Sequence, residues 1–205
     1  SDEIQTMQDS DRATLVFFQD EMHLQDWKNS TYGKRYGKSE INTVTSANIG
    51  AIDHYVRQST QRKQVTLFPK VFGRGLDFQC FDKAVIGHGG VHVIQTFLSE
   101  EKSEEIQIFG RTYRQGQKGT CKMILLEDDL LNWHELKDQS EGGVLVTKEQ
   151  LTNPQPSETK SGETKSASSR FDEPLYCLLN EKRIDWFSKL SAERSEKVSN
   201  AKTQH

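Results

Sequence analysis

Short apolar runs alternate with amphipathic segments through the first 137 residues, and this alternation is what most restricts the fold. Runs rich in Val, Ile, Phe and Thr predict six β-strands, at 13–18, 41–45, 64–68, 83–88, 91–97 and 121–126. Helical spacing of apolar residues falls between them, at 20–30, 47–61 and 104–114, and a fourth helix begins near Glu127. Alternating strands and helices form a mostly parallel sheet with helices on both faces, so the sequence predicts an α/β fold.

The helix predicted at 47–61 shows this spacing most clearly. Ile49, Ile52 and Val56 fall on one stripe, which we expect to face the sheet. Ser46 directly precedes this pattern and has the side chain of a typical N-cap.

The domain organisation follows from a change in composition after residue 136. The segment 137–170 is rich in Ser, Thr, Lys and Glu and contains two prolines, which indicates a flexible linker or insertion over 137–171. Helical spacing resumes afterwards, so 172–205 is predicted to be a helical extension. The α/β domain is assigned to 13–136, and 1–12 to a polar N-terminal segment.

Bulk composition excludes several classes of protein. The net charge is −3, so a cationic binding site has to be local. The longest apolar runs have five or six residues, too few to cross a membrane, and the N-terminus does not resemble a secretory signal. The chain does not begin with Met, so we expect a processed chain or a fragment. Cys80, Cys121 and Cys177 are odd in number and far apart, which favours free thiols in a reducing, cytoplasmic compartment.

The segment 105–119 combines cations with regularly spaced apolar residues. On a helix, its apolar residues share a face that we expect to pack on protein; they are Ile106, Phe109 and Tyr113. A second face carries the polar residues Gln107, Arg111 and Arg114. Gly110 falls within the helix at a cost of about 1 kcal/mol, which suggests close approach of another backbone. A solvated basic face on a surface helix explains the same pattern, and this segment alone does not decide between the two.

The loop that follows the predicted strand at 64–68 is a second candidate site. Gly73 and Gly75 flank Arg74, and Asp77 follows closely. Loops at the carboxyl ends of parallel strands are where α/β sheets bind ligands, and glycine lets the backbone approach a ligand. Arg74 could then bind a phosphate and Asp77 a ribose hydroxyl or a water molecule. A structural Arg–Asp pair closing an ordinary loop is the alternative.

Other patterns imitate known sites without matching them. The string at 33–39 is one residue short of the phosphate-binding pattern G-x-x-x-x-G-K-S/T, so it is interpreted as a loop. The acidic residues at 127–129 suit a helix N-terminus. His88 and His92 are four residues apart, but Gly89–Gly90 lie between them and the flanking segments have strand spacing, so they do not form a helical ligand pair and no metal site is predicted.

Three ordered motifs within 13–130 carry a resemblance to a known family. They are "VTLFPKVFGRGLDF" (65–78), "GGVHVIQT" (89–96) and "QIFGRTYRQG" (107–116). They follow the patterns V-T-I/L-x-x-x-x-x-G-R-G-x-D-I/F, G-G-L/V-H-I/V-I-x-T and Q-x-x-G-R-x-x-R-Q-G. The region therefore resembles the second RecA-like domain of superfamily-2 motor ATPases, and most closely the SecA-type preprotein translocase motor.

The resemblance implies a fold, a cofactor and partners. It implies a RecA-like domain of the P-loop NTPase type that closes over ATP, while a separate P-loop domain, absent from this sequence, holds the phosphates and Mg²⁺. Such a chain hydrolyses ATP only with that domain, supplied in cis or in trans. A translocated polypeptide and a membrane translocon are the further partners implied, at a cytoplasmic or peripheral membrane location, and nucleic acid is not expected.

The resemblance also implies roles for individual residues. Arg111 and Arg114 match the family's arginine fingers, which neutralise charge on the transferred phosphoryl group. Gln107 would orient a phosphate or a water molecule, while Arg74 and Asp77, in the loop with Gly73 and Gly75, would couple nucleotide binding to domain closure.

This sequence also departs from the family. Pro69–Phe72 replace T-N-M-A, Tyr113 replaces a glycine, and 99–105 is acidic where translocases are rich in arginine. Two alternatives therefore stay open: a fragment of a nucleic-acid helicase or remodeller, and a non-catalytic interaction module.

Overall fold

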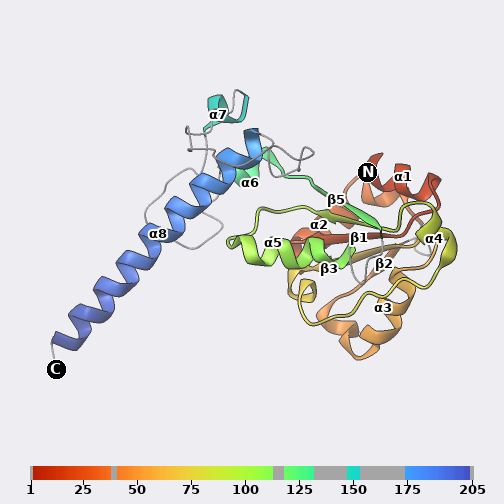
Figure 1. The fold of residues 1–205 in the computed structure, drawn as a ribbon, viewed down its shortest axis with the longest axis horizontal. Coiled ribbons are helices and arrows are strands. Elements are labelled where there is room, and N and C mark those ends of the chain that lie inside the picture. The colour runs from red at the N-terminus through yellow and green to blue at the C-terminus, as the bar shows by residue number, and fades with distance from the viewer. Residues whose placement is uncertain (1, 38–40, 113–117, 132–146, 153–173, 204–205) are drawn as a thin grey trace. The chain divides into compact units, whose positions relative to one another are not determined.

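The computed structural model describes residues 2–37, 41–112, 118–131, 147–152 and 174–203 (Figure 1). The chain divides into two compact units, with the boundary between Leu126 and Glu127. The first unit contains the sheet. The second contains α6 (Glu127–Leu131), α7 (Lys148–Thr152) and α8 (Pro174–Thr203).

The first unit is built on a five-stranded sheet in which every pair of neighbouring strands is parallel. The strands are β1 (Thr14–Phe18), β2 (Ile41–Thr43), β3 (Val65–Pro69), β4 (Val91–Gln95) and β5 (Gly119–Met123), and their order is β2-β3-β1-β4-β5. All residues of β1, β3 and β4 are buried, as expected for central strands of a parallel sheet. The sheet confirms the predicted α/β fold.

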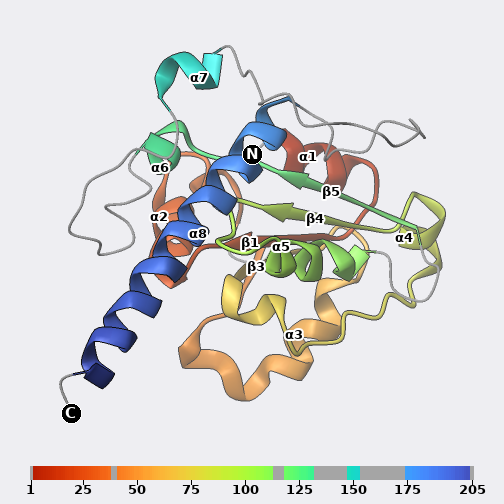
Figure 2. The ribbon, with the colours of Figure 1, turned by 60° about the vertical axis from the view of Figure 1, so that its left-hand side comes forward.

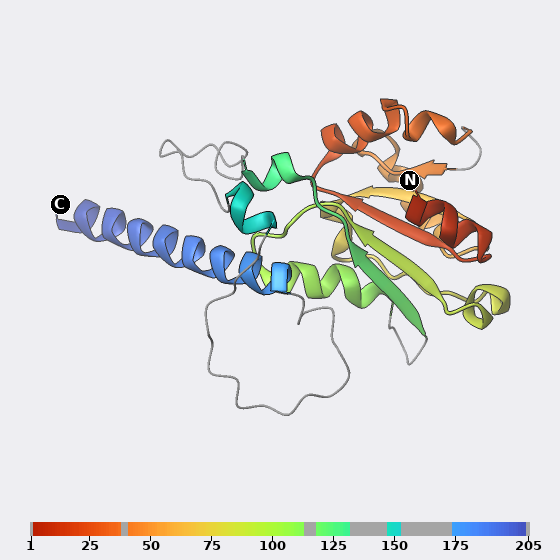
Figure 3. The same cartoon turned by 90° about the horizontal axis from the view of Figure 1, so that it is seen from above.

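Helices cover both faces of this sheet. Figure 3 shows α1 (Asp2–Asp9) and α2 (Glu21–Asn29) on one side and α5 (Lys102–Phe109) on the other. The helix α3 (Ile52–Ser59) packs against β3. Asp20 caps α2, because its carboxylate accepts a hydrogen bond from the backbone N–H of His23 at 2.9 Å.

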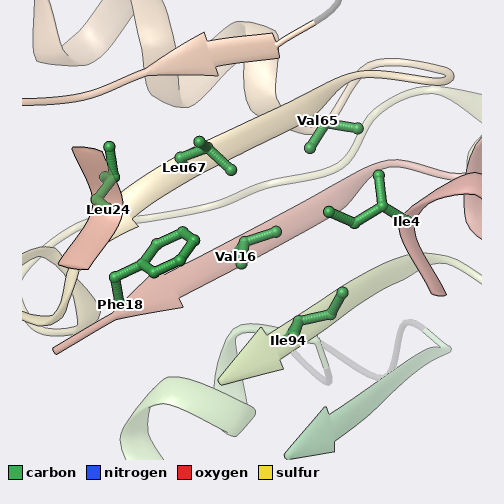
Figure 4. Packing of buried hydrophobic residues seen from close by; sticks show 7 residues of the cluster. All are labelled: Ile4, Val16, Phe18, Leu24, Val65, Leu67 and Ile94. Atoms are coloured by element: carbon green, nitrogen blue, oxygen red, sulfur yellow. The ribbon is translucent and has the colours of Figure 1, made fainter. Parts of the chain in front are cut away.

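A hydrophobic core fills the face beneath α1 and α2. Its buried members are Ile4, Val16, Phe18, Leu24, Val65, Leu67 and Ile94 (Figure 4). Ile4 comes from α1, within the segment 1–12 that the sequence analysis set apart from the α/β domain. This segment is therefore part of the packing of the first unit.

The opposite face of the sheet carries a cluster of aromatic side chains, because neighbouring residues in a strand point to opposite faces. Phe17 and Phe68 are register partners on β1 and β3, and their rings stack with centroids 5.4 Å apart. Phe78 meets both rings edge-on, at 6.3 Å from Phe17 and 5.3 Å from Phe68. Phe72 lies 6.3 Å from Phe68. This cluster lies directly beneath the loop that follows β3.

The strand predicted at 83–88 is wrong. Residues Lys83–Gly87 form the short helix α4. Asp82 acts as its N-cap, accepting hydrogen bonds from the backbone N–H groups of Ala84 at 2.9 Å and Val85 at 3.4 Å. Val85 is the one residue of α4 that is buried, so the helix needs a single apolar contact and no pairing strand.

The helix predicted at 47–61 has a different start. A 3₁₀ helix spans Ser46–Ala51, and α3 begins at Ile52. The N-cap position is Thr45, not Ser46, and the Thr45 N–H donates to Asn48 Oδ1 at 2.8 Å. Ile49 is 54% exposed, whereas Val56 is buried as predicted. The 3₁₀ turn changes the angular spacing, so Ile49 leaves the predicted stripe.

In the second unit, α8 forms the predicted helical extension and runs as one continuous helix (Figure 2). Leu178 and Leu179 are buried, whereas Ile184 and Phe187 are 54% and 43% exposed. Most of the predicted linker, 137–171, falls outside the described residues. Among the described residues, Cys80, Cys121 and Cys177 form no disulfide, and of the three Cys80 is buried. None of the helices in the described part of the chain combines the length and apolarity that crossing a membrane requires.

Candidate functional site

The candidate site lies at the edge of the sheet where the strands end. All five strands are parallel, so their carboxyl ends meet at one edge, the usual ligand-binding edge of an α/β sheet. There β3 continues into a 3₁₀ turn at Lys70–Gly73 and then into an irregular segment reaching Phe78. We call residues 73–78 the β3 loop.

The β3 loop is buried at its two ends and exposed between them. Gly73 and Phe78 are buried at its two ends, and Phe78 is only 2% exposed. Arg74, Gly75 and Asp77 are exposed between them. Gly75 has φ +79°, a conformation that favours glycine. Arg74, predicted to bind a phosphate, and Asp77, predicted to bind a ribose hydroxyl or a water molecule, are thus exposed in a loop whose two ends are buried.

Helix α5 packs tightly against the start of the loop. A β-carbon added to Gly73 would lie 2.7 Å from Cγ1 of Ile108, which is fully buried. Such a distance is shorter than real β-carbons adopt, so this packing requires glycine at position 73. The close backbone approach predicted at Gly110 is wrong, because a β-carbon added there would meet nothing within 4 Å. The tight contact at Gly73 is made with the side chain of Ile108.

Arg111 joins the turn after α5 to the β3 loop. Its Nε and Nη2 both donate to the carbonyl oxygen of Gly73, the former at 3.0 Å, and Nη1 donates to the carbonyl oxygen of Leu76 at 2.6 Å. Its Cζ lies 5.9 Å from the centre of the Phe78 ring. The residue is 9% exposed. In this structure the Arg111 guanidinium is therefore turned onto the loop.

The structure differs from the single helix over 104–114, with one apolar and one polar face, that the sequence predicted. The buried residues of α5 are Glu105, Ile108 and Phe109, whereas Ile106 is 53% exposed. The α-helix ends at Phe109 and a 3₁₀ turn follows at Gly110–Thr112, so Arg111 does not continue the helical face of Gln107. Gln107 is exposed, as predicted. Tyr113 and Arg114 lie outside the described residues.

Two polar groups at this edge of the sheet were missed from the sequence. Gln95, at the end of β4, is fully buried, and its Nε2 donates to the carbonyl oxygen of Phe97 at 2.8 Å and to Ser99 Oγ at 3.0 Å. Asp20 follows β1, and its pKa is lowered, because hydrogen bonds from the His23 backbone and ring outweigh the effect of burial. For Gln95 and Asp20 alike, the available sequence signal was a polar residue close to the end of an apolar run.

The site offers cationic and glycine-rich contacts and no metal centre. Among the described residues, no three His, Cys, Asp or Glu side chains are grouped so that they could hold a metal ion. His92 instead forms a 2.6 Å hydrogen bond through Nδ1 with Thr120 Oγ1 on the neighbouring strand. The exposed Arg74, together with open space beside Gly75, fits an anionic phosphate group presented from outside this domain.

Comparison of sequences finds similarity to SecA. Protein translocase subunit SecA 2 of Listeria welshimeri and that of Listeria monocytogenes are each 40% identical to this chain over 83 residues, which cover 40% of this chain and 11% of the relative. Protein translocase subunit SecA of Syntrophus aciditrophicus is 39% identical over 77 residues, covering 37% of this chain and 9% of the relative. The chain therefore matches about a tenth of the length of these relatives. No model of a protein family matches.

Solved structures with some likeness to this chain include two motor domains. The second helicase domain of the DEAD-box protein Mss116p, bound to an RNA duplex, has a TM-score of 0.41 and 19% identity, and the match covers 70% of this chain and 53% of that one. The C-terminal part of the Fun30 ATPase domain has a TM-score of 0.42 and 14% identity, over 62% of this chain and 41% of that one. The resemblance to SecA proposed from the motifs is confirmed by the sequence comparison over a partial stretch.

Proposed function

We propose that residues 13–136 act as the nucleotide-closing half of a SecA-like ATPase motor. The observation that carries the proposal is the β3 loop, which presents Arg74 and Asp77 to solvent at the carboxyl edge of a parallel sheet. The 40% identity to SecA 2 over 83 residues supports the same assignment. A P-loop domain, in the same protein or in a partner, completes the site.

In this proposal, residues of this domain bind the side of the nucleotide that the P-loop domain leaves uncovered. Arg74 binds a phosphate, Asp77 accepts a hydrogen bond from a ribose hydroxyl or holds a water molecule, and Gly75 lets the backbone approach. Gln107, exposed on α5, orients a phosphate or a water molecule. ATP would be the nucleotide that is hydrolysed, and the P-loop domain would hold its Mg²⁺.

Of the two arginines matched to finger positions, Arg114 keeps that role in the proposal. A finger has to reach the charge that develops on the transferred phosphoryl group, and such a contact is worth about 10³–10⁵ in rate. Arg111 donates three hydrogen bonds to the β3 loop, so it cannot reach a nucleotide without leaving that loop.

The work driven by hydrolysis is proposed to be polypeptide movement. The relatives are protein translocase subunits, and this chain matches a small part of them. The implied partners are a polypeptide substrate and a membrane translocon, reached from the cytoplasmic side.

The test combines this chain with the P-loop domain of a SecA relative and measures ATP hydrolysis. Activity is expected only in the mixture, and Arg114→Ala lowers it at least a hundredfold. Arg57→Ala, an exposed arginine on α3, serves as the matched control and leaves the rate unchanged. A mixture that never exceeds the rate of the P-loop domain alone would refute the motor. Salt-dependent binding of single-stranded nucleic acid in place of ATPase activity would favour the helicase alternative.

A further inference from the structure

Arg111 is buried and hydrogen-bonded to the backbone of the β3 loop, an arrangement that an arginine finger does not need. It is 9% exposed, and its Nε, Nη1 and Nη2 all donate to backbone carbonyl oxygens of Gly73 and Leu76. A guanidinium has a planar fork of donors, and this geometry lets one side chain satisfy two carbonyl groups at once. These hydrogen bonds go to backbone carbonyl oxygens, so they hold the path of the loop without depending on the identity of the loop side chains.

The same loop is held at two further points. Gly73 lies against Ile108, so closely that a β-carbon would not fit, and Phe78 packs edge-on against both Phe17 and Phe68. Arg111 spans the distance between them, bonding to Gly73 at one end and lying 5.9 Å from the Phe78 ring at the other. The exposed residues Arg74, Gly75 and Asp77 are thus carried by a backbone that is fixed on both sides.

We infer that Arg111 is a positioning residue: it holds the β3 loop in one conformation so that Arg74 and Asp77 face a shared ligand. This inference rests on the proposed function, in which the ligand is a nucleotide. It assigns Arg111 no contact with the reacting phosphoryl group. Its effect on ATP hydrolysis passes through the loop.

The first test needs no nucleotide. Arg74 is an exposed trypsin site within the loop, so the rate of cleavage after Arg74 in the full chain, measured by mass spectrometry, reports how firmly the loop is held. Arg111→Lys keeps the charge, but one ammonium group cannot reproduce the fork between two carbonyls. We expect cleavage after Arg74 to become at least tenfold faster in Arg111→Lys.

Cleavage after Arg57 on α3 provides the internal reference. If the variant merely lowered global stability, both sites would be cleaved faster by the same factor, and the inference would be overturned. Arg57→Lys is the matched substitution, and it leaves cleavage after Arg74 unchanged. Equal rates at Arg74 in the parent chain and in Arg111→Lys would likewise overturn the inference.

The second test separates positioning from catalysis. In the mixture with a P-loop domain, Arg111→Lys is expected to raise KM for ATP at least fivefold while kcat changes less than twofold, because a loosened loop weakens ground-state and transition-state contacts alike. A hundredfold loss of kcat at unchanged KM would instead make Arg111 a finger and overturn the inference. If no mixture hydrolyses ATP, the proposed function fails, and the tryptic rates still decide whether Arg111 holds the loop.

Discussion

Gly73 and Ile108 are in direct contact, and this contact sets the distance between the β3 loop and helix α5. A β-carbon on Gly73 would lie 2.7 Å from Cγ1 of Ile108, and the Ile108 side chain is fully buried. Ile108 is branched at Cβ, which restricts χ1, so Cγ1 does not rotate away freely from this contact. Glycine at position 73 therefore reflects packing, whatever the loop binds.

Gly73→Ala is expected to destabilise the protein. Forcing a methyl group into this contact costs about 1–3 kcal/mol in the free energy of unfolding, measured by urea denaturation. Gly110→Ala is the matched control, because Gly110 has φ −60° and open space around it. That change is expected to be neutral or to stabilise by up to about 1 kcal/mol. Equal effects of the two substitutions would contradict the packing described.

Phe68 is expected to be one of the most sensitive positions in the fold. It is fully buried and contacts the rings of Phe17, Phe72 and Phe78. Phe68→Ala removes this shared surface and is expected to cost about 3–5 kcal/mol, whereas Phe68→Leu, which keeps most of the volume, costs about 1–2 kcal/mol. Thermal and urea unfolding measure both. A loss below 1 kcal/mol in the alanine variant would show that the cluster does not anchor the loop.

Asp20 is expected to give α2 a pH-dependent stability. Its folded pKa lies below the ordinary value of 3.8, so its stabilising effect is complete above that pH and is lost as the pH falls through the folded pKa. At pH 7, Asp20→Ala removes the N-cap and costs about 1 kcal/mol or less, since the carboxylate is half exposed. Urea denaturation between pH 7 and pH 3 should show this difference shrinking as the carboxylate is protonated.

The control for this prediction is Asp20→Asn, which keeps an oxygen that can accept from the His23 N–H without carrying a charge. Its stability relative to Asp20→Ala is expected to stay constant over the same pH range. A gap between the aspartate and alanine proteins that stays constant down to pH 3 would contradict the assignment.

Arg12 is expected to stabilise the amino-terminal end of β4, at the edge of the sheet opposite the candidate site. Its guanidinium donates to the carbonyl oxygens of Gly90 at 2.8 Å and Gly89 at 3.1 Å, and to Thr120 Oγ1 at 2.7 Å. Burial lowers the pKa of Arg12. Arg12→Met keeps the apolar stem and is expected to cost about 2–4 kcal/mol, because buried carbonyls lose charged donors. Arg12→Lys should recover part of that loss in the same denaturation experiment.

The sequence predicted those elements whose signal is local and repeated. The runs that form β1, β3 and β4 are rich in apolar residues and predict buried elements, and their length fits strands. The run at 83–88 carries the same residue types over the same length, but Asp82 caps it as a helix. Short apolar runs do not distinguish the two structures, and the capping interaction decides between them.

The site was predicted less completely than the fold, for a physical reason. The sequence places Arg74 and Asp77 in an exposed loop after β3, and the structure agrees. The direction of Arg111 depends on where the α-helix tightens to a 3₁₀ turn after Phe109 and on the carbonyl groups of a loop more than thirty residues away. Helical periodicity assumes a constant angle per residue, so it cannot show either effect.

The strand order has a consequence for synthesis of this protein on the ribosome. The middle strand, β1, is made first, yet its two hydrogen-bonding partners are β3 and β4. The end of β4 follows the end of β1 by 77 residues, which takes roughly 4–15 s at ordinary elongation rates. Both edges of the apolar β1 segment are open until β3 has been made, and the edge that pairs with β4 stays open until the end of that interval. Binding by a chaperone during this time would keep the nascent chain from aggregating.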